Sequence, residues 1–340
     1  MAEKCNNFTN NSSLSKIKSK YILKQIFINL QYNKFLDIIK YNKKFQKIKN
    51  LTLNDYKKEH YKIVIEIIPK NNIYGKFINI NKNYESSYHI YINNSKEEIK
   101  KYSIDKFDII TKVKIILDQK IKSLNGLFKE CNCIEKINFI KFKRKDIKNM
   151  SNIFDGCSSL KEINLSNFIT ENVTNMKGMF YGCWSLKEIN FSNFSNFDTK
   201  NVKDTSYMFS GCSSLKELNL TNFKTDKVNY MNYMFSGCRS LKELNLFNFV
   251  TNNVISMQYM FSWCTSLEKL DLSSFITDNV TNMSHMFERC SSLKELTLSN
   301  FKTNDFVDMN GMLEGCFSLK KLNCENQFIK YEFKQLSKFK

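Results

Sequence analysis

Residues 211–238 read GCSSLKELNLTNFKTDKVNYMNYMFSGC, and this stretch decides the fold because it begins and ends on the same Gly-Cys pair. Eight of the eleven cysteines keep this register, 26 residues apart except for one interval of 29 that holds a three-residue insertion within 194–197. They are Cys131, Cys157, Cys183, Cys212, Cys238, Cys264, Cys290 and Cys316. A fixed period of this length is typical of a solenoid, in which each repeat stacks on its neighbours.

Each repeat contains two apolar patterns. Leu218, Asn219 and Leu220 alternate with period two, which predicts a short strand with one buried face. The apolar residues of the following segment are spaced as on a helix: Val173, Met176, Met179, Phe180 and Cys183. Thr170 or Asn172 is expected to cap that helix at its start. The sequence therefore predicts an α/β solenoid with a parallel sheet on one face and short helices on the other.

The repeat resembles the BspA-like branch of leucine-rich repeats, whose 26-residue unit is built around N-V-x-x-M-x-x-M-F-x-G-C-x-S-L. The resemblance implies a leucine-rich-repeat-type solenoid whose repeats bind other macromolecules, and many proteins of that kind are surface or adhesion proteins. Trp263 and Arg289 stand where the motif has glycine. Their presence predicts that a left-handed backbone is not required there.

The chain is expected to have five parts. Residues 1–15 are expected to be a disordered N-terminus, 16–50 a helical segment and 51–110 a small β-rich region, which together make a mixed α+β N-terminal region. Residues 111–328 are expected to form eight repeats, with 111–117 as an opening coil. The spacing of Ile329, Phe333 and Leu336 predicts a helix over 329–340 that caps the last coil.

The helical segment contains ILKQIFINLQYNKFLDIIKYNKKFQK at 22–47, which resembles an F-box. The resemblance implies docking to a Skp1-type adaptor of a ubiquitin ligase, with the repeats holding the substrate. Lys20-Tyr21 replaces the usual Leu-Pro opening. The alternative is a three-helix cap with only a structural role.

Charge and hydropathy bear on location and partners. The net charge is +19, and 24 basic and 11 acidic residues, a net +13, lie in 1–120. The lysines are dispersed without an arginine-rich run, which favours a solvated surface over nucleic-acid binding. No stretch approaches the ~18–20 apolar residues of a membrane span. The first twenty residues lack the apolar core of a secretory signal, so we expect a cytoplasmic protein.

The sequence gives no support to catalysis. His60, His89 and His285 are isolated from any cysteine, serine or acid that would complete a catalytic group, so we expect no enzyme activity and no cofactor. Cys131-x-Cys133 lacks a partner pair, so no metal site is predicted. Cysteines on adjacent coils are near enough for disulfides, but their place in an apolar run favours a ladder of buried, reduced thiols.

Protein binding is the remaining function class. Residues that flank the buried strand leucines should face outward, and aromatic and arginine residues dominate interface energetics. The expected contact residues on the strands are Glu188, Asn190, Glu217, Asn219, Glu243, Asn245, Phe247, Lys269, Asp271 and Glu295. Candidates near the cysteines are Trp184, Arg239 and Trp263, and Tyr207, Tyr233 and Tyr259 form a further row. The sequence thus predicts a scaffold for a protein partner, either an intracellular adaptor or a surface adhesin.

Overall fold

The computed structural model describes residues 61–118, 120–302 and 307–336, and the chain divides into two units, 1–62 and 63–340. The segments expected to be disordered (1–15) and F-box-like (16–50) lie outside the described residues, so their interpretation stays a prediction.

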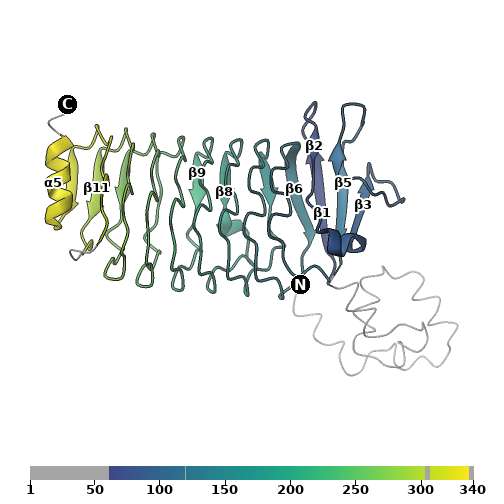
Figure 1. Ribbon diagram of the computed structural model, residues 1–340, viewed down its shortest axis with the longest axis horizontal. Helices are drawn as coiled ribbons and strands as arrows, with labels where there is room; N and C mark the ends of the chain where they lie inside the picture. Colours follow the sequence, from purple (N-terminus) through teal and green to yellow (C-terminus); the bar gives the residue numbers. More distant parts are fainter. Residues whose placement is uncertain (1–60, 119, 303–306, 337–340) are drawn as a thin grey trace, which may run out of the picture. The chain divides into compact units, whose positions relative to one another are not determined.

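The repeats form a solenoid of leucine-rich-repeat type, whose coils follow one another in chain order (Figure 1). One side carries short parallel strands in which each residue pairs with its counterpart in the next coil, as Ile189 does with Leu218. The parallel strands are β6 (Ile134–Lys141), β7 (Glu162–Asn164), β8 (Glu188–Asn190), β9 (Glu217–Asn219), β10 (Lys269–Asp271), β11 (Glu295–Leu298) and β12 (Lys321–Cys324). A single 3-10 turn, η4 (Phe191–Asn193), follows β8 near the three-residue insertion. The parallel sheet predicted for one face is confirmed.

The core consists of identical side chains stacked from coil to coil. Phenylalanine rings form one such ladder, with 5.3 to 5.9 Å between neighbouring ring centroids. Its members are Phe128, Phe154, Phe180, Phe209, Phe235, Phe261 and Phe287, all buried. A repeat of 26 residues is too small to enclose these rings alone, so each coil depends on its neighbours for burial.

The side opposite the strands, the turn side, differs from the prediction, because the described coils contain turns there and no helices. The Gly178 and Phe180 amides donate to carbonyls of the next coil, at 2.8 and 2.9 Å, whereas the Met179 amide donates to Met176 in its own coil at 3.2 Å. Gly178 and Gly182 have φ of 58° and 66°. A left-handed residue at every fourth position interrupts the uniform φ of a helix, although it leaves apolar residues at helix-like spacing.

The expectation that the backbone at Trp263 and Arg289 need not be left-handed is wrong. Trp263 and Arg289 do adopt left-handed φ, 60° and 56°, like the glycines of the sister coils. Backbone hydrogen bonds between coils hold this geometry even where the residue has a Cβ. The Trp263 amide donates to the Glu288 backbone carbonyl at 2.8 Å, and the Arg289 amide donates to the Glu314 backbone carbonyl at 2.7 Å. The local preference of the residue is therefore overridden by the neighbouring coil.

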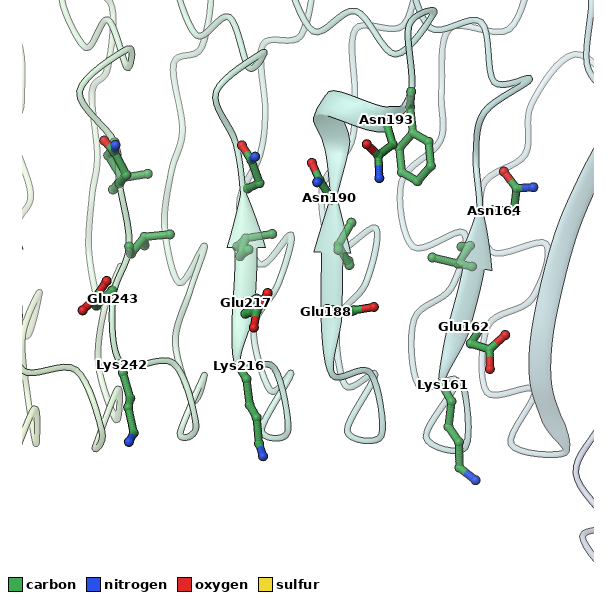
Figure 2. A pocket seen from close by; sticks show the side chains of 18 of the residues that line it. Lys161, Glu162, Asn164, Glu188, Asn190, Asn193, Lys216, Glu217, Lys242 and Glu243 are labelled. Carbon is green, nitrogen blue, oxygen red and sulfur yellow. The ribbon is translucent and has the colours of Figure 1, made fainter.

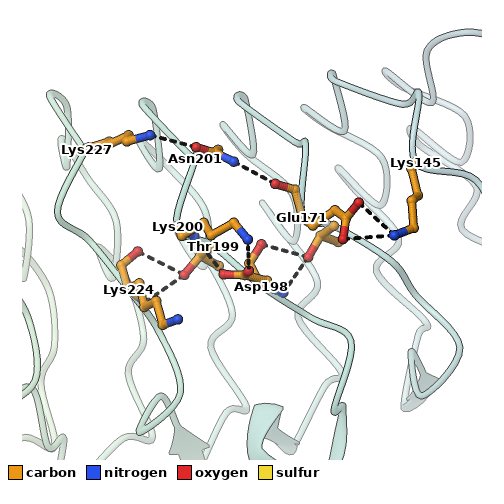
Figure 3. Close-up of polar contacts among 9 residues, drawn as sticks. Lys145, Glu171, Asp198, Thr199, Lys200, Asn201, Lys224 and Lys227 are labelled. Carbon is orange, nitrogen blue, oxygen red and sulfur yellow. Dashed lines mark hydrogen bonds and ion pairs between the residues drawn. The ribbon is translucent and has the colours of Figure 1, made fainter.

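The expected helix caps, Thr170 and Asn172, instead bond to neighbouring coils. The Thr170 hydroxyl donates to the Asp198 carbonyl at 2.8 Å, and the Asn172 amide group donates to the Lys145 carbonyl at 2.9 Å. Figure 3 shows the same arrangement one coil further on, where Thr199 both donates to the Lys224 carbonyl and accepts from the Lys224 amide. These buried threonines tie successive coils together and satisfy backbone groups that have left the sheet.

The start of the unit is an antiparallel cap. β1 (Ile63–Pro69) pairs antiparallel with β6 on one side and with β5 (Val113–Leu117) on the other, and β3 (Tyr88–Ile92) completes the sheet. The segment 111–117, expected as an opening coil, therefore contains the antiparallel strand β5 instead. The shorter elements here are β2 (Gly75–Lys76), η3 (Lys82–Ser87) and β4 (Ser103–Ile104).

A buried arginine joins this cap to the first coil. Arg144 donates to the Ile121 carbonyl at 2.6 Å and binds Asp146 at 2.7 Å. Burial opposes ionisation of Asp146, but hydrogen bonds from Arg144 and Lys122 outweigh it and lower the Asp146 pKa to about 2.

The other end of the solenoid is covered by α5 (Gln327–Leu336), which buries Ile329 and Leu336. Glu332 of this helix accepts a hydrogen bond from the Leu313 amide at 3.2 Å. In earlier coils the corresponding amides donate to the next coil, as Phe209 does to Met234. Glu332 thus supplies the acceptor that a further coil would have provided.

Candidate protein-binding surface

The outward-facing side chains of the strands, which we call the strand face, line a shallow groove of about 1710 Å³. Figure 2 shows three parallel rows across successive coils: lysines at 161, 216 and 242, glutamates at 162, 188, 217 and 243, and asparagines at 164 and 190. Every strand residue expected at the interface lines this groove except Glu295. The alternation of the strands puts the intervening Ile or Leu into the core, as at Ile189 and Leu218.

The glutamate row is paired with lysines at its two ends, Glu162 and Glu295, but not in its middle. At one end Lys136 binds Glu162 at 2.7 Å, and at the other Lys269 binds Glu295 at 3.3 Å. Within the described residues no ion pair is formed by the middle residues Glu188, Glu217 and Glu243 or by the lysines beside them, Lys187, Lys216 and Lys242. Glu188 and Glu217 are direct partners in the sheet register, and such like-charge neighbours oppose folding.

The asparagines have a structural task that the sequence analysis did not assign to them. The side-chain oxygen of Asn190 accepts from the Ser192 amide at 3.0 Å, and that of Asn219 accepts from the Thr221 amide at 3.0 Å. Asn245 and Asp271 make the same contact to the residue two positions on. These contacts turn the chain after each strand.

Phe247 is an aromatic residue at a position where five other coils carry serine or threonine. Its side chain is 67% exposed beside the groove, next to Asn245. An exposed aromatic side chain at the edge of a polar trough is the kind of residue that anchors protein interfaces.

The candidates near the cysteines lie on a different surface. Trp184, Arg239 and Trp263 line a second groove of about 540 Å³ on the turn side, and none of them lines the strand-face groove. Arg239 and Arg289 both lie over the Trp263 ring, 5.3 and 4.7 Å from its centroid. These cation–π contacts position the Trp263 ring within this chain.

The third predicted group forms a stacked aromatic ladder, comprising Tyr207, Tyr233, Tyr259 and His285, whose neighbouring rings lie 4.6 to 4.7 Å apart. All four residues have left-handed φ, between 55° and 61°. Partial burial raises the pKa of Tyr207, Tyr233 and Tyr259. Since each ring is covered by the next, this ladder contributes mainly to coil stacking.

The cysteines of the repeats are buried, as the ladder interpretation predicts. The Cys212 thiol donates to the Phe180 carbonyl at 3.1 Å, and the same contact recurs in the other coils, as from Cys264 to Phe235 at 3.2 Å. Burial raises the pKa of Cys212 and Cys264 to about 12, which leaves almost no reactive thiolate at neutral pH. These thiols are hydrogen-bonded structural groups.

The described histidines are also engaged within the chain. His89 lies between two carboxylates, with Nδ1 2.9 Å from Glu98 and Nε2 3.4 Å from Asp118. His285 ends the aromatic ladder and stacks on Tyr259.

The fold and its open strand face define a leucine-rich-repeat-type solenoid. The chain belongs to the family described as "Mycoplasma protein of unknown function, DUF285", which it matches over residues 122–244 and 215–326. No curated protein matches it.

Two solved structures are similar to this chain. A leucine-rich repeat protein from Bacteroides ovatus is 20% identical, with 69% of this chain and 70% of that chain covered and a TM-score of 0.34. A leucine rich cell surface protein from Faecalibacterium prausnitzii is 12% identical, with 75% and 96% covered and a TM-score of 0.26.

Proposed function

We propose that this protein is a non-enzymatic scaffold that binds a protein partner through the strand face of its middle coils. The observation that carries the proposal is the unpaired charge there. Among the described residues Glu188, Glu217 and Glu243 have no ion-pair partner, whereas Glu162 and Glu295 of the same row are each paired with a lysine. A partner that presents basic side chains to this row relieves the repulsion, and electrostatic complementarity of this kind steers association and sets register.

Phe247 supplies the apolar part of the same surface. It lies beside the glutamate row and is exposed, so a partner can bury its ring while pairing with the carboxylates. An apolar anchor surrounded by polar groups is the usual arrangement of a binding hot spot.

The test is quantitative affinity purification from extracts of the source cells with the full chain and two variants. The strand-face variant carries Glu188→Gln, Glu217→Gln, Glu243→Gln and Phe247→Ser. The matched control carries Asp226→Asn, Asp278→Asn and Tyr230→Ser, which also removes acids and an exposed aromatic but at positions outside the groove. We expect the partner to be retained by the control and lost from the strand-face variant, since one hot spot contributes ~2 kcal/mol or more. Equal recovery by both variants would contradict the proposal.

An adaptor role is the sharper form of this proposal, and it rests on the F-box-like pattern of 22–47. In that form the N-terminal segment docks a Skp1-type protein in the cytoplasm while the strand face holds the substrate. Pull-down with a Skp1-type protein tests it, with the chain 51–340 as the control. Enrichment no greater than that of 51–340 rules the adaptor role out and leaves the scaffold intact.

The second candidate is a surface adhesin, which the BspA-like repeat pattern favours. Among the helices that the structure describes, none has the length and apolar character of a membrane span. Protease treatment of intact source cells separates the two candidates, because an adhesin is degraded from outside and an adaptor is protected.

A further inference from the structure

The last two coils of the solenoid differ at two positions from the three coils that precede them. In the three preceding coils a tyrosine of the aromatic ladder is followed three residues later by serine, as in Tyr259 and Ser262. In the next coil these positions hold His285 and Glu288, and in the last they hold Gly311 and Glu314. The two coils thus replace an aromatic and hydroxyl pair with an imidazole and two carboxylates.

The structure brings these side chains together. One ring nitrogen of His285 and one carboxylate oxygen from each of Glu288 and Glu314 lie within 4.8 Å of one another. Gly311 permits this approach, because a Cβ at that position would lie 2.7 Å from His285 Nδ1 and 3.2 Å from Glu314 Oε2. A tyrosine there, as in the earlier coils, would fill the space between the donors.

The three donors make few contacts with other groups of this chain. His285 Nδ1 is shielded from solvent and accepts or donates no hydrogen bond, and its nearest carboxylate oxygen, on Glu288, is 3.7 Å away. Glu288 is 3.4 Å from the Ser262 hydroxyl and 3.7 Å from Arg289. Over the described residues, the Glu314 carboxylate forms no hydrogen bond or ion pair. A buried nitrogen without a partner beside two carboxylates is unfavourable unless another group completes the site.

We propose that His285, Glu288 and Glu314 bind a divalent transition-metal cation, with Zn²⁺ as the best match. Imidazole nitrogen and carboxylate oxygen are ligands that Zn²⁺ accepts at ~2.0–2.2 Å, and a set of three protein ligands with water as the fourth is common. On binding of the ion, the two glutamate side chains would rotate to bring their oxygens into that range. The nitrogen donor disfavours Ca²⁺ and Mg²⁺, which prefer oxygen ligands.

The cation would connect two coils and secure the end of the solenoid. His285 and Glu288 come from one coil and Glu314 from the next, so the metal adds a cross-link where a further coil is missing and only α5 covers the core. Binding to the folded chain alone stabilises it against unfolding, since the donors are brought together only by stacking of the coils.

Isothermal titration of the metal-free full chain with Zn²⁺ tests the proposal. We expect one bound ion per chain, and binding at least ~10-fold weaker in His285→Tyr and in Glu314→Gln, because losing even an outer partner of a metal site typically costs ~10- to 100-fold. His285→Tyr restores the residue of the three preceding coils, so its fold is expected to remain intact. His89→Gln is the matched control, since His89 also lies beside two carboxylates but has both ring nitrogens engaged.

Two readouts distinguish this site from metal binding elsewhere on the chain. Co²⁺ in place of Zn²⁺ should give visible absorption without a thiolate-to-metal charge-transfer band, whereas such a band would assign the ion to cysteines and overturn the proposal. Zn²⁺ should raise the unfolding temperature of the wild type and of His89→Gln but not of His285→Tyr. Absence of binding to the wild type, or unchanged binding to His285→Tyr, also overturns it.

Discussion

The strand side and the turn side of the solenoid are built by the same repeats but join neighbouring coils in different ways. On the strand side the parallel ladder is divided into separate groups, such as β8–β9 and β10–β11–β12. On the turn side an unbroken series of parallel bridges runs coil by coil from Asn149 to Asp308. The turn side therefore holds the stack together most continuously, which leaves the strand face free to vary.

The side chains of the two sides also differ in how much they vary from coil to coil. Buried phenylalanine, cysteine and threonine recur from coil to coil, and each bonds or packs against the neighbouring coil. The outward positions of the strand face change from Glu188 to Lys269 and from Ser192 to Phe247. Positions that must fit a neighbour in the stack tolerate few residues, whereas positions that meet solvent or a partner tolerate many.

The largest effect is expected from Phe235→Ala, in the middle of the phenylalanine ladder. Phe235 is fully buried between Phe209 and Phe261, so its loss leaves a cavity open to two coils. We expect the free energy of unfolding to fall by ~3–5 kcal/mol in chemical denaturation. A loss below ~1 kcal/mol would mean that the turn side does not carry the stack.

Leu244→Ala is the equivalent truncation of a buried side chain on the strand side. Leu244 is buried beneath the strand face, and its truncation is expected to cost ~2–5 kcal/mol. Because adjacent coils depend on one another, Phe235→Ala and Leu244→Ala should each reduce the cooperativity of unfolding as well as the urea concentration at its midpoint. A smaller loss for Leu244→Ala than for Phe235→Ala, measured in the same urea series, supports the division of roles.

Gly237→Ala probes the left-handed positions. Gly237 has φ of 73°, and a Cβ there would lie 3.5 Å from Gly211 Cα, so alanine fits in space but not in conformation. We expect a loss of ~1–2 kcal/mol. Gly237→Asn is the matched comparison and should cost less, because asparagine adopts left-handed φ more readily. Equal losses for the two variants would assign the cost to crowding.

The period, the stacking and the parallel strands could be predicted from the sequence because identical residues at a fixed interval must lie on top of each other. The turns could not, since Val173, Met176 and Met179 have the spacing of a helix whether the chain is helical or bonded to the next coil. The left-handed backbone of Trp263 could not be predicted either, because it is imposed by a hydrogen bond from the Trp263 amide to the Glu288 backbone carbonyl in the next coil.

The candidate site was accessible from the sequence only in part. The alternation of apolar and polar residues identified which strand residues face outward. It did not reveal that Lys269 forms an ion pair with Glu295, or that the Asn190 side chain accepts a hydrogen bond from the Ser192 amide in the turn that follows. The cluster of His285, Glu288 and Glu314 follows no contiguous motif, because its members come from two coils. Comparing each repeat with its sisters, position by position, is the signal that could have found it.

Glu332→Gln tests the C-terminal end with a smaller effect. Burial raises the pKa of Glu332 above 4.5, although the Leu313 and Gly311 amides that donate to it act in the opposite direction. A carboxyl group with a raised pKa in the folded state favours folding when protonated, so its contribution is complete below the unfolded pKa and is lost as pH rises through the folded value.

The wild type should therefore lose stability relative to Glu332→Gln as the pH rises above the ordinary glutamate pKa. Urea denaturation of both chains over this pH range measures the difference. A constant difference would show that the Glu332 carboxyl is not buried against the last coil.

Glu243→Ala is expected to have the smallest effect on stability, and that is what makes it informative. Glu243 is exposed on the strand face one residue before buried Leu244, and among the described residues it has no ion-pair partner. Its loss should change the free energy of unfolding by less than ~0.5 kcal/mol. If the chain is a scaffold, the same substitution should weaken capture of the protein partner, because a residue that the fold does not need can be used for binding. A large loss of stability from Glu243→Ala would show that the strand face serves the stack itself, and the contrast between the two sides of the coil would no longer hold.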